Sequence, residues 1–399
     1  MRRSIILVLL LLLGASPASA RVWRVEKNGT GDFTVIQQAI EASSAGDTIR
    51  IGPGRYDDKF QWGTPPWQQY TRVLVTKPNL TLIGAGASAT IIGDGVPLDA
   101  DHDHDSALAN ATSAAGANLF LSEIGFENCY FGVYLYDIGT ATVSHCRFRG
   151  NDASAIAHVQ TGLAVEDCQF ESLSDAYDFA AHVVAWGPGH INVARSALST
   201  SRIHLRAHEH VHLEGVVAAT VADCTLEGGA IGIYAASGAG LLTVRDSVID
   251  DQFNKGIVHE MGAGTIRVSD TVMRNQYTAF SSIAPGAIWE LDRVVVEEAI
   301  TCSFVFVGLG GGHIRNSQLA KGVQYVVMDS SSGTRSSSLT FDMTNNWWGT
   351  ANPDSIQAWI YDGNDQPTRP YYFIDWDPYR SVPVSSEKRS LGGVKALFR

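Results

Sequence analysis

Val143-Ser-His-Cys-Arg-Phe148, Val165-Glu-Asp-Cys-Gln-Phe170 and Val221-Ala-Asp-Cys-Thr-Leu226 are copies of one short pattern that recurs nine times between Ile124 and Leu319. The fourth residue of each copy is its marker. An apolar residue lies three positions before every marker, and another lies two after it. A spacing near 23 residues with a strand pattern in each copy is typical of a solenoid. The nine markers are Cys129, Cys146, Cys168, Ser196, Cys224, Ser247, Thr271, Val294 and Ser317.

The two apolar positions of each copy are five residues apart, an odd number. A straight strand would place them on opposite faces, so both can point inward only if the chain bends between them. The residue before the marker is Asn or Asp in six of nine copies, and these side chains tolerate a left-handed conformation. The pattern therefore predicts a strand, a one-residue corner and a second strand in each coil. We expect an all-β fold, a right-handed parallel β-helix with parallel strands about 4.8 Å apart.

The markers should form one inward-facing column, and Phe170 should lie in the core beside it. Four of the five cysteines are markers. We expect a ladder of buried thiols, since cysteine is among the most buried residue types. Disulfides between neighbouring coils remain an alternative for Cys129, Cys146 and Cys168.

Residues 1–20 have the composition of a signal peptide: Arg2 and Arg3, an apolar run from Ile5 to Leu13, then Ala18-Ser-Ala20. The run is too short to span a bilayer, and no later stretch is longer. We therefore expect an exported protein, secreted or on the cell surface, without a membrane span. Loss of Arg2 and Arg3 would change the formal charge from −12 to −14, which argues against nucleic acid as a partner.

The repeat favours one elongated domain over residues 21–380. We expect this domain to be a monomer whose partner is a polysaccharide. Within this domain the pattern predicts an N-terminal cap over 21–60, core coils over 119–320 and a C-terminal cap over 345–380. Residues 381–399 are predicted to form a flexible tail.

Residues 25–95 resemble the N-terminal segment of pectin-lyase-like β-helices, most closely that of pectinesterases. The matching segments are Val25-Glu-Lys-Asn-Gly-Thr-Gly-Asp-Phe-Thr-Val-Ile-Gln-Gln-Ala-Ile40, Gly46-Asp-Thr-Ile49, Gly52-Pro-Gly-Arg-Tyr56 and Leu80-Thr-Leu-Ile-Gly84. Thr34 and Gln37 have the spacing of a capping box, and Ile36, Ala39 and Ile40 form the apolar stripe of a short helix. A solenoid must seal its first coil, and we expect this helix to do so.

The resemblance carries over little pectinesterase chemistry. Cys168-Gln-Phe170 followed by Asp175 has the spacing of the family's general acid. The next coil has no second aspartate at the equivalent place, and the chain has no L-G-R-P-W segment. Ester hydrolysis of this type needs a nucleophilic carboxylate beside the acid, so the sequence argues against pectinesterase activity.

The C-terminal segment Asn345-Asn-Trp-Trp-Gly349 resembles the last coil of exported bacterial β-helix proteins, including those with the carbohydrate-binding and sugar-hydrolysis repeat. Trp347, Trp348, Trp359 and Trp376 are bulky enough to seal the open core, so we expect an aromatic cap.

Two stretches outside the repeat are candidate binding sites. The run Asp101-His-Asp-His-Asp105 combines oxygen ligands suited to calcium with imidazoles suited to zinc, or it is a solvated acidic turn. Its candidate ligands for a divalent metal are Asp101, His102, Asp103, His104 and Asp105. Trp62 and Trp67 lie in an aromatic insertion that either stacks against sugar rings or covers the first coils.

The segment from Arg202 to Leu213 alternates strictly, which predicts a strand with one exposed cationic face. Nearby coils add Asp175, His158, His182, Tyr234 and His259. The candidate catalytic residues are Asp175, His182, His208 and His259. The candidate substrate-binding residues are Arg202, His204, Arg206, His210 and Tyr234, with His212 on the same face.

This face has three interpretations: a polysaccharide site, a metal site, or an ordinary polar surface of a repeating coil. We expect a polysaccharide-binding protein whose ligand includes acidic sugars, with lyase or glycoside hydrolase activity left open. A non-catalytic scaffold or adhesion rod is the alternative. The sequence establishes no cofactor beyond the candidate divalent metal.

Overall fold

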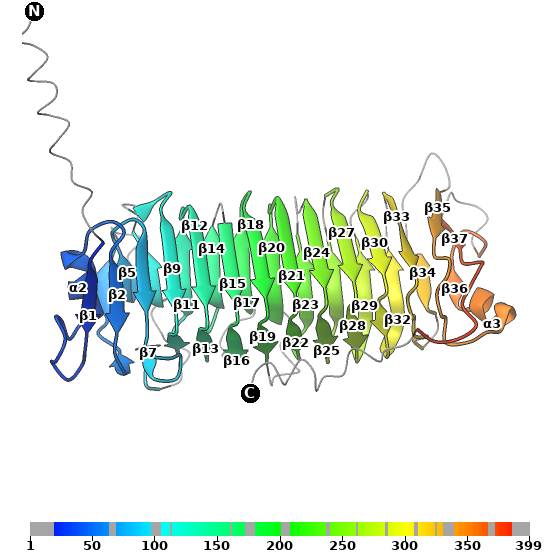
Figure 1. Cartoon of the computed structure of the whole chain (residues 1–399). Coiled ribbons are helices and arrows are strands. Elements are labelled where there is room, and N and C mark those ends of the chain that lie inside the picture. The colour runs from blue at the N-terminus through cyan, green and yellow to red at the C-terminus, as the bar shows by residue number, and fades with distance from the viewer. Residues whose placement is uncertain are drawn as a thin grey trace, which may run out of the picture.

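The computed structural model describes residues 20–63, 69–96, 105–111, 114–159, 162–171, 180–200, 208–236, 240–260, 262–283, 286–306, 310–323, 325–329, 339–365 and 372–384. They form a parallel β-helix that advances from the N-terminus to the C-terminus along one axis (Figure 1). Each of the central coils contributes one strand to each of three sheets, here sheets A, B and C. The prediction of a right-handed parallel β-helix is confirmed.

Sheet A contains 14 strands in the described part of the chain, and their side chains alternate between buried and solvent-facing positions. Its strands are β1 Val22–Val25, β2 Thr48–Ile51, β6 Leu80–Ile83, β9 Asn118–Ser122, β12 Thr140–Ser144, β15 Gly162–Glu166, β18 His190–Ala194, β21 Ala218–Ala222, β24 Leu241–Arg245, β27 Thr265–Ser269, β30 Ile288–Asp292, β33 Gly311–Arg315, β35 Leu339–Asp342 and β37 Tyr372–Asp375.

Sheet B is built from short strands that follow the corner of each coil, ten in the part described. Its strands are β3 Gly54–Tyr56, β7 Thr90–Gly93, β10 Gly125–Glu127, β13 Arg147–Arg149, β16 Gln169–Glu171, β19 Ala197–Ser199, β22 Thr225–Glu227, β25 Val248–Asp250, β28 Val272–Arg274 and β31 Val295–Val296.

Sheet C has the longest strands and carries the candidate sites described below. An antiparallel hairpin of β4 and β5 begins it, and the strands from β5 onward pair in parallel. Its strands are β4 Phe60–Trp62, β5 Gln69–Val75, β8 Ser106–Asn110, β11 Phe131–Tyr136, β14 Ser154–Val159, β17 Ala180–Trp186, β20 His208–Glu214, β23 Ile231–Ala235, β26 Lys255–His259, β29 Gln276–Ser282, β32 Ala299–Phe306, β34 Val327–Asp329 and β36 Ile360–Tyr361.

The corner between sheets A and B is one residue with positive φ, as predicted. His145 has φ 53° and Asp167 has φ 55°, so the chain turns without a longer loop. The marker that follows each corner points inward and is buried; Cys146 and Cys168 are 2% and 0% exposed. One marker was misplaced: Cys129 follows a corner between sheets B and C. Ile124, after Glu123 with φ 61°, is the true equivalent in that coil.

Phe170 is in the core, as predicted, where its ring stacks on Phe148 with 4.8 Å between centroids. The marker cysteines are free thiols, so the buried-ladder prediction is confirmed over the disulfide alternative. Burial raises the pKa of the Cys224 thiol to about 12, which keeps that thiol neutral and poorly nucleophilic.

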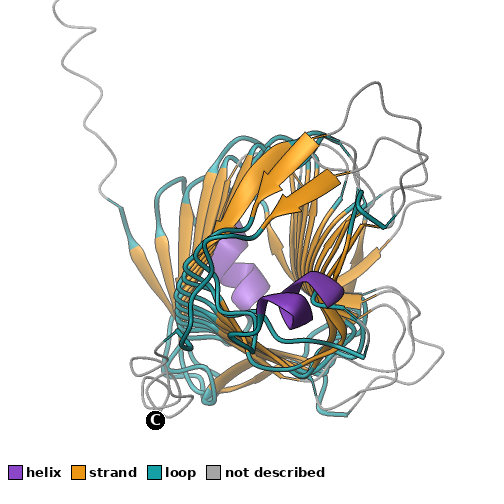
Figure 2. Ribbon diagram, turned by 90° about the vertical axis from the view of Figure 1, so that its right-hand side faces the viewer, coloured by secondary structure: helices purple, strands orange, loops and turns teal. Residues whose placement is uncertain are grey.

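One helix caps each end of the solenoid, as the view along the axis shows (Figure 2). At the N-terminal end α2, Ile36–Ala42, buries Ile36, Ala39 and Ile40 against the first coil. The predicted capping box is wrong. Val35 occupies the N-cap position without a side-chain hydrogen bond, and Gln37 instead accepts a hydrogen bond from the Leu74 N–H at 2.9 Å.

At the C-terminal end, Trp348 is fully buried, while Trp359 and Trp376 pack partly buried against the core. The helix α3, Pro353–Ala358, follows, with Asn352 as its N-cap. The aromatic cap is confirmed. Among the described residues, no helix is long and apolar enough to cross a membrane.

Candidate functional site

Two histidines of sheet C lie inside the coil. His182 in β17 and His210 in β20 stack with 5.0 Å between ring centroids, and their Nδ1 atoms are 2.9 Å apart. The ring of Phe170, a core residue, is 5.6 Å from that of His182. Both histidines are 1% exposed. The prediction that His210 faces solvent is therefore wrong.

The strand geometry explains this inversion. The equivalent positions in other coils are Gly132, Gly232 and Gly256, where a Cβ would lie 2.9 Å or less from Phe148, Ile249 or Met273 of the facing sheet. This column points inward, although the next residue of each strand, such as Val211, also belongs to the core. Strict alternation fails at the start of these strands, and a count of every second residue therefore misplaces His210.

The hydrogen bonds define the tautomers of the interior pair. His210 Nε2 lies 2.8 Å from the Gly228 carbonyl, which only accepts, so Nε2 carries the hydrogen. In the neutral ring Nδ1 is then an acceptor, and His182 Nδ1–H donates to it. Burial lowers the pKa of His210 to about 4 and holds the pKa of His182 well below its usual value, which keeps both rings neutral.

His158 and His259 also point inward. The register places His158 beside Leu135 and His259 beside Ala235, and both neighbours belong to the core. Burial lowers the pKa of both rings, to about 4 for His158. His182 and His259 were predicted to lie on an outer face as candidate catalytic residues. This placement is wrong, because both rings point into the coil.

His208 begins β20, where it is 1% exposed rather than on an open face. Electrostatic repulsion from the nearby His208 helps to lower the pKa of His182 and of His210. The other members of the predicted stripe lie outside the described residues, as does one predicted acid: Arg202, His204, Arg206 and Asp175.

The outer face of β20 carries a carboxylate–imidazole pair. His212 lies between Val211 and Leu213, two core residues, so its ring points away from the core. His212 Nδ1 is 2.6 Å from Glu209 Oε2. Glu209 and His212 are 6% and 7% exposed, so the pair is well shielded. We call these two residues the Glu209–His212 pair.

This pair has the arrangement of a base held by an orienting acid. A carboxylate only accepts, so the hydrogen of the neutral ring is on Nδ1 and the lone pair is on Nε2. Burial raises the pKa of Glu209, the hydrogen bond from His212 opposes that rise, and the charge of Glu260 adds to it. A desolvated carboxylate beside an imidazole is a frequent feature of proton-transfer sites.

Tyr234 completes the cluster. The register pairs it with His212 across β20 and β23, and the two rings stack at 5.2 Å with 23° between their planes. Glu214 Oε2 lies 3.9 Å from His212 Nε2. Lys255 shares the Glu209 column two strands further on, and burial lowers its pKa. Tyr234 was predicted from the sequence as a substrate-binding residue, whereas Glu209 was not assigned a role.

The described part of the predicted metal site does not fit a metal. Asp105 is buried, and its carboxylate is 2.7 Å from Arg72 Nη1 and accepts the Tyr130 N–H at 2.9 Å. Asp101, His102, Asp103 and His104 lie outside the described residues. Within the residues that the structure describes, no cluster of three or more His, Cys, Asp or Glu side chains could hold a metal ion.

The aromatic insertion is only partly described. Trp62 is half-buried in β4, where it pairs with Gln69 of β5. This position is compatible with the interpretation in which the ring covers the first coils. Trp67 lies outside the described residues.

Comparisons with known proteins give a likeness of fold. No protein-family model matches the chain, and no curated protein matches its sequence. Among solved structures, a pectin methylesterase from carrot is similar with 14% identity and a TM-score of 0.36 over 70% of this chain and 84% of that one. Pectin methylesterase PemA from Erwinia chrysanthemi has 12% identity and a TM-score of 0.32, covering 65% and 80%. A pectin methylesterase from Aspergillus niger has the same identity and TM-score, covering 75% and 87%.

Proposed function

We propose that this protein is exported, binds a polysaccharide across the outer face of sheet C, and acts on it by proton transfer. The observation that supports the proposal best is the Glu209–His212 pair, held at 2.6 Å on the outward side of a rigid sheet. Long parallel strands position its side chains better than a loop would.

Each residue of the cluster has a distinct role in this proposal. His212 Nε2 takes a proton from a water molecule whose oxygen bonds to the anomeric carbon as the glycosidic C–O bond breaks, and Glu209 stabilises the imidazolium that forms. The phenol of Tyr234, stacked on that imidazole, supplies the proton to the leaving oxygen. This step is a hydrolysis, whereas an elimination would require His212 to take the C5 proton of a uronate unit as the bond to the leaving oxygen breaks.

The charge around the pair bears on the ligand. Glu209 and Glu214 place two carboxylates beside His212, and the charge of Glu260 acts on Glu209; the described residues of the Glu209 column include one lysine, Lys255. An acidic sugar at this point would meet like charges. The described residues therefore favour an uncharged unit here, while an acidic unit near Arg202 and Arg206 stays a prediction.

The test is product release from a panel of purified plant and bacterial polysaccharides, measured as new reducing ends and as absorbance of unsaturated sugars. We expect at least one substrate, and a loss of about 100-fold or more in rate for His212→Gln. His190→Gln changes an exposed histidine on sheet A and is the matched control. Equal rates for His212→Gln and the wild type would contradict the proposal. An absence of both binding and products would favour the scaffold or adhesion rod.

A further inference from the structure

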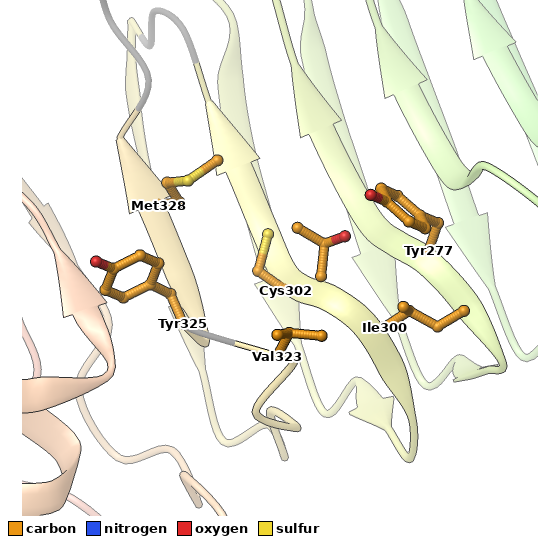
Figure 3. Close-up of a pocket in the computed structure, with 7 residues that line it drawn as sticks. Tyr277, Ile300, Cys302, Val323, Tyr325 and Met328 are labelled. Carbon is orange, nitrogen blue, oxygen red and sulfur yellow. The ribbon is translucent and has the colours of Figure 1, made fainter.

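A hollow on the outer face of sheet C lies toward its C-terminal end. It has a volume of about 270 Å³ and is lined by Tyr277, Ile300, Thr301, Cys302, Val323, Tyr325 and Met328 (Figure 3). Tyr277 and Tyr325 stand on opposite sides, with Cys302 between them. We call it the bulge pocket.

A β-bulge forms this pocket. Gln276 pairs with Ala299 and Thr278 pairs with Cys302, so Tyr277 alone stands opposite two residues, Ile300 and Thr301. An extra residue of this kind bends a strand and re-aims its side chains, and bulges are over-represented beside functional sites.

The following loop closes over the bulge. The Val323 N–H donates to the Ile300 carbonyl at 2.8 Å. At Gly322 a Cβ would lie only 1.9 Å from the Thr301 carbonyl oxygen, so this close approach requires glycine. The backbone of the bulge and of the following loop therefore defines the shape of the pocket.

Its chemistry is apolar and uncharged. Tyr277, Ile300 and Val323 are 49%, 54% and 74% exposed, a concentration of large apolar side chains in solvent that marks an interaction site. None of the seven lining residues carries a charge: Cys302 has the side chain that is ordinarily the most acidic among them, and burial raises the pKa of its thiol to about 12. A charged ligand would lose its hydration there without a counter-charge.

The register connects the pocket to the Glu209–His212 pair. One column of sheet C runs through Glu209, Ile231, Lys255, Thr278 and Cys302. Four strand spacings separate its ends, about 19 Å along the same outer face. A chain of sugars laid along this column would reach both places.

We propose that the bulge pocket is a second carbohydrate subsite, which takes an uncharged pyranose unit of the polysaccharide that reaches the Glu209–His212 pair. The apolar face of the pyranose ring packs on Tyr277, whose planar ring offers a matching surface. The proposal rests on the proposed function for the identity of the ligand as a polysaccharide.

The test uses the full chain labelled with ¹³C at its methionine methyl groups. Met328 lines the pocket, whereas Met273 and Met343 are fully buried and serve as internal references. The probes are hexasaccharides of glucose, mannose and galactose, with hexagalacturonate as the acidic counterpart. We expect at least one uncharged probe to shift the Met328 resonance.

Two variants sharpen the result. Tyr277→Ala should weaken the binding of that probe about ten-fold, and Val323→Asp should weaken it as well by adding a charge. Phe120→Ala, an exposed ring on sheet A, is the control. The subsite is refuted if no uncharged probe moves Met328, if hexagalacturonate binds as tightly, or if Tyr277→Ala binds like the wild type.

The proposed catalytic activity and the proposed subsite can be refuted independently of each other. Glu209→Gln should abolish product release while leaving the Met328 response unchanged. A Met328 response without any product from the wild type would contradict the proposed activity but support the subsite. Product release without any shift of the Met328 resonance would support the proposed activity and contradict the subsite.

Discussion

His210 and His212 stand two residues apart in β20, yet one ring lies inside the coil and the other lies outside it. The interior ring bonds only to another imidazole and a carbonyl, so its proton stays fixed. The outer ring is paired with a carboxylate. The same side chain is thus packing in one place and a candidate base in the other, and its partners make the difference.

The largest expected effect concerns the interior. Phe170 contacts both Phe148 and His182, so Phe170→Ala should lower the free energy of unfolding by about 3–5 kcal/mol. Urea unfolding at neutral pH measures it. Phe120→Ala on the outside of sheet A should cost under about 1 kcal/mol. Similar losses for the two variants would mean that the interior is poorly packed.

The second effect is acid destabilisation by interior imidazoles. The pKa of His158 is about 4 in the folded protein and near 6.5 when unfolded, so only the unfolded chain binds a proton between these values. Stability should therefore fall as pH drops from 6.5 to 4, by about 3 kcal/mol for this residue.

His158→Leu isolates that contribution, because Leu135 and Leu213 occupy the same column in other coils. Unfolding free energies at pH 7 and pH 4 should differ less for the variant, by about 3 kcal/mol. Identical pH dependence in the two proteins would place His158 in contact with solvent.

The smallest effect concerns Glu209 on the outer face. Its folded pKa is raised, so between the unfolded value near 4.5 and the raised one the folded state keeps a proton that the unfolded state has lost. Stability then falls as pH rises through this window, and the carboxylate is a cost at neutral pH.

Glu209→Gln should accordingly raise the free energy of unfolding at pH 7 by about 1 kcal/mol or less, while removing activity. The melting temperature reports this rise. A lower melting temperature at pH 7 would show that the pair stabilises the fold instead of serving chemistry.

The sequence contained most of the fold, because each corner repeats the same local requirement. Asp167, Asp223 and Asp246 turn the chain at φ 51–56°, and a buried marker residue follows each of them. The site was harder to predict. Strict alternation placed His210 outside, whereas its column holds Gly132, Gly232 and Gly256, which indicates an inward position with little room.

Aligning the equivalent positions of neighbouring coils would have placed His210 correctly. His182 and His210 are 28 residues apart, as are their coil markers Cys168 and Ser196, so both occupy the same column as the three glycines. The bulge pocket had no such signal. It depends on one added residue in β32 relative to β29, and such a slip is visible only once strands are paired.

The unequal lengths of the sheets have a mechanical consequence. Sheet B ends at β31, which joins β28 through only two residue pairs, while sheets A and C continue to β37 and β36. Beyond β31 the described residues continue this third side only as isolated bridges, from Val295 to Gln318 and from Gln318 to Trp347, so it joins the last coils less extensively than sheets A and C do. Under tension along the axis every coil carries the same load in series, so the molecule should begin to unravel from its C-terminal end.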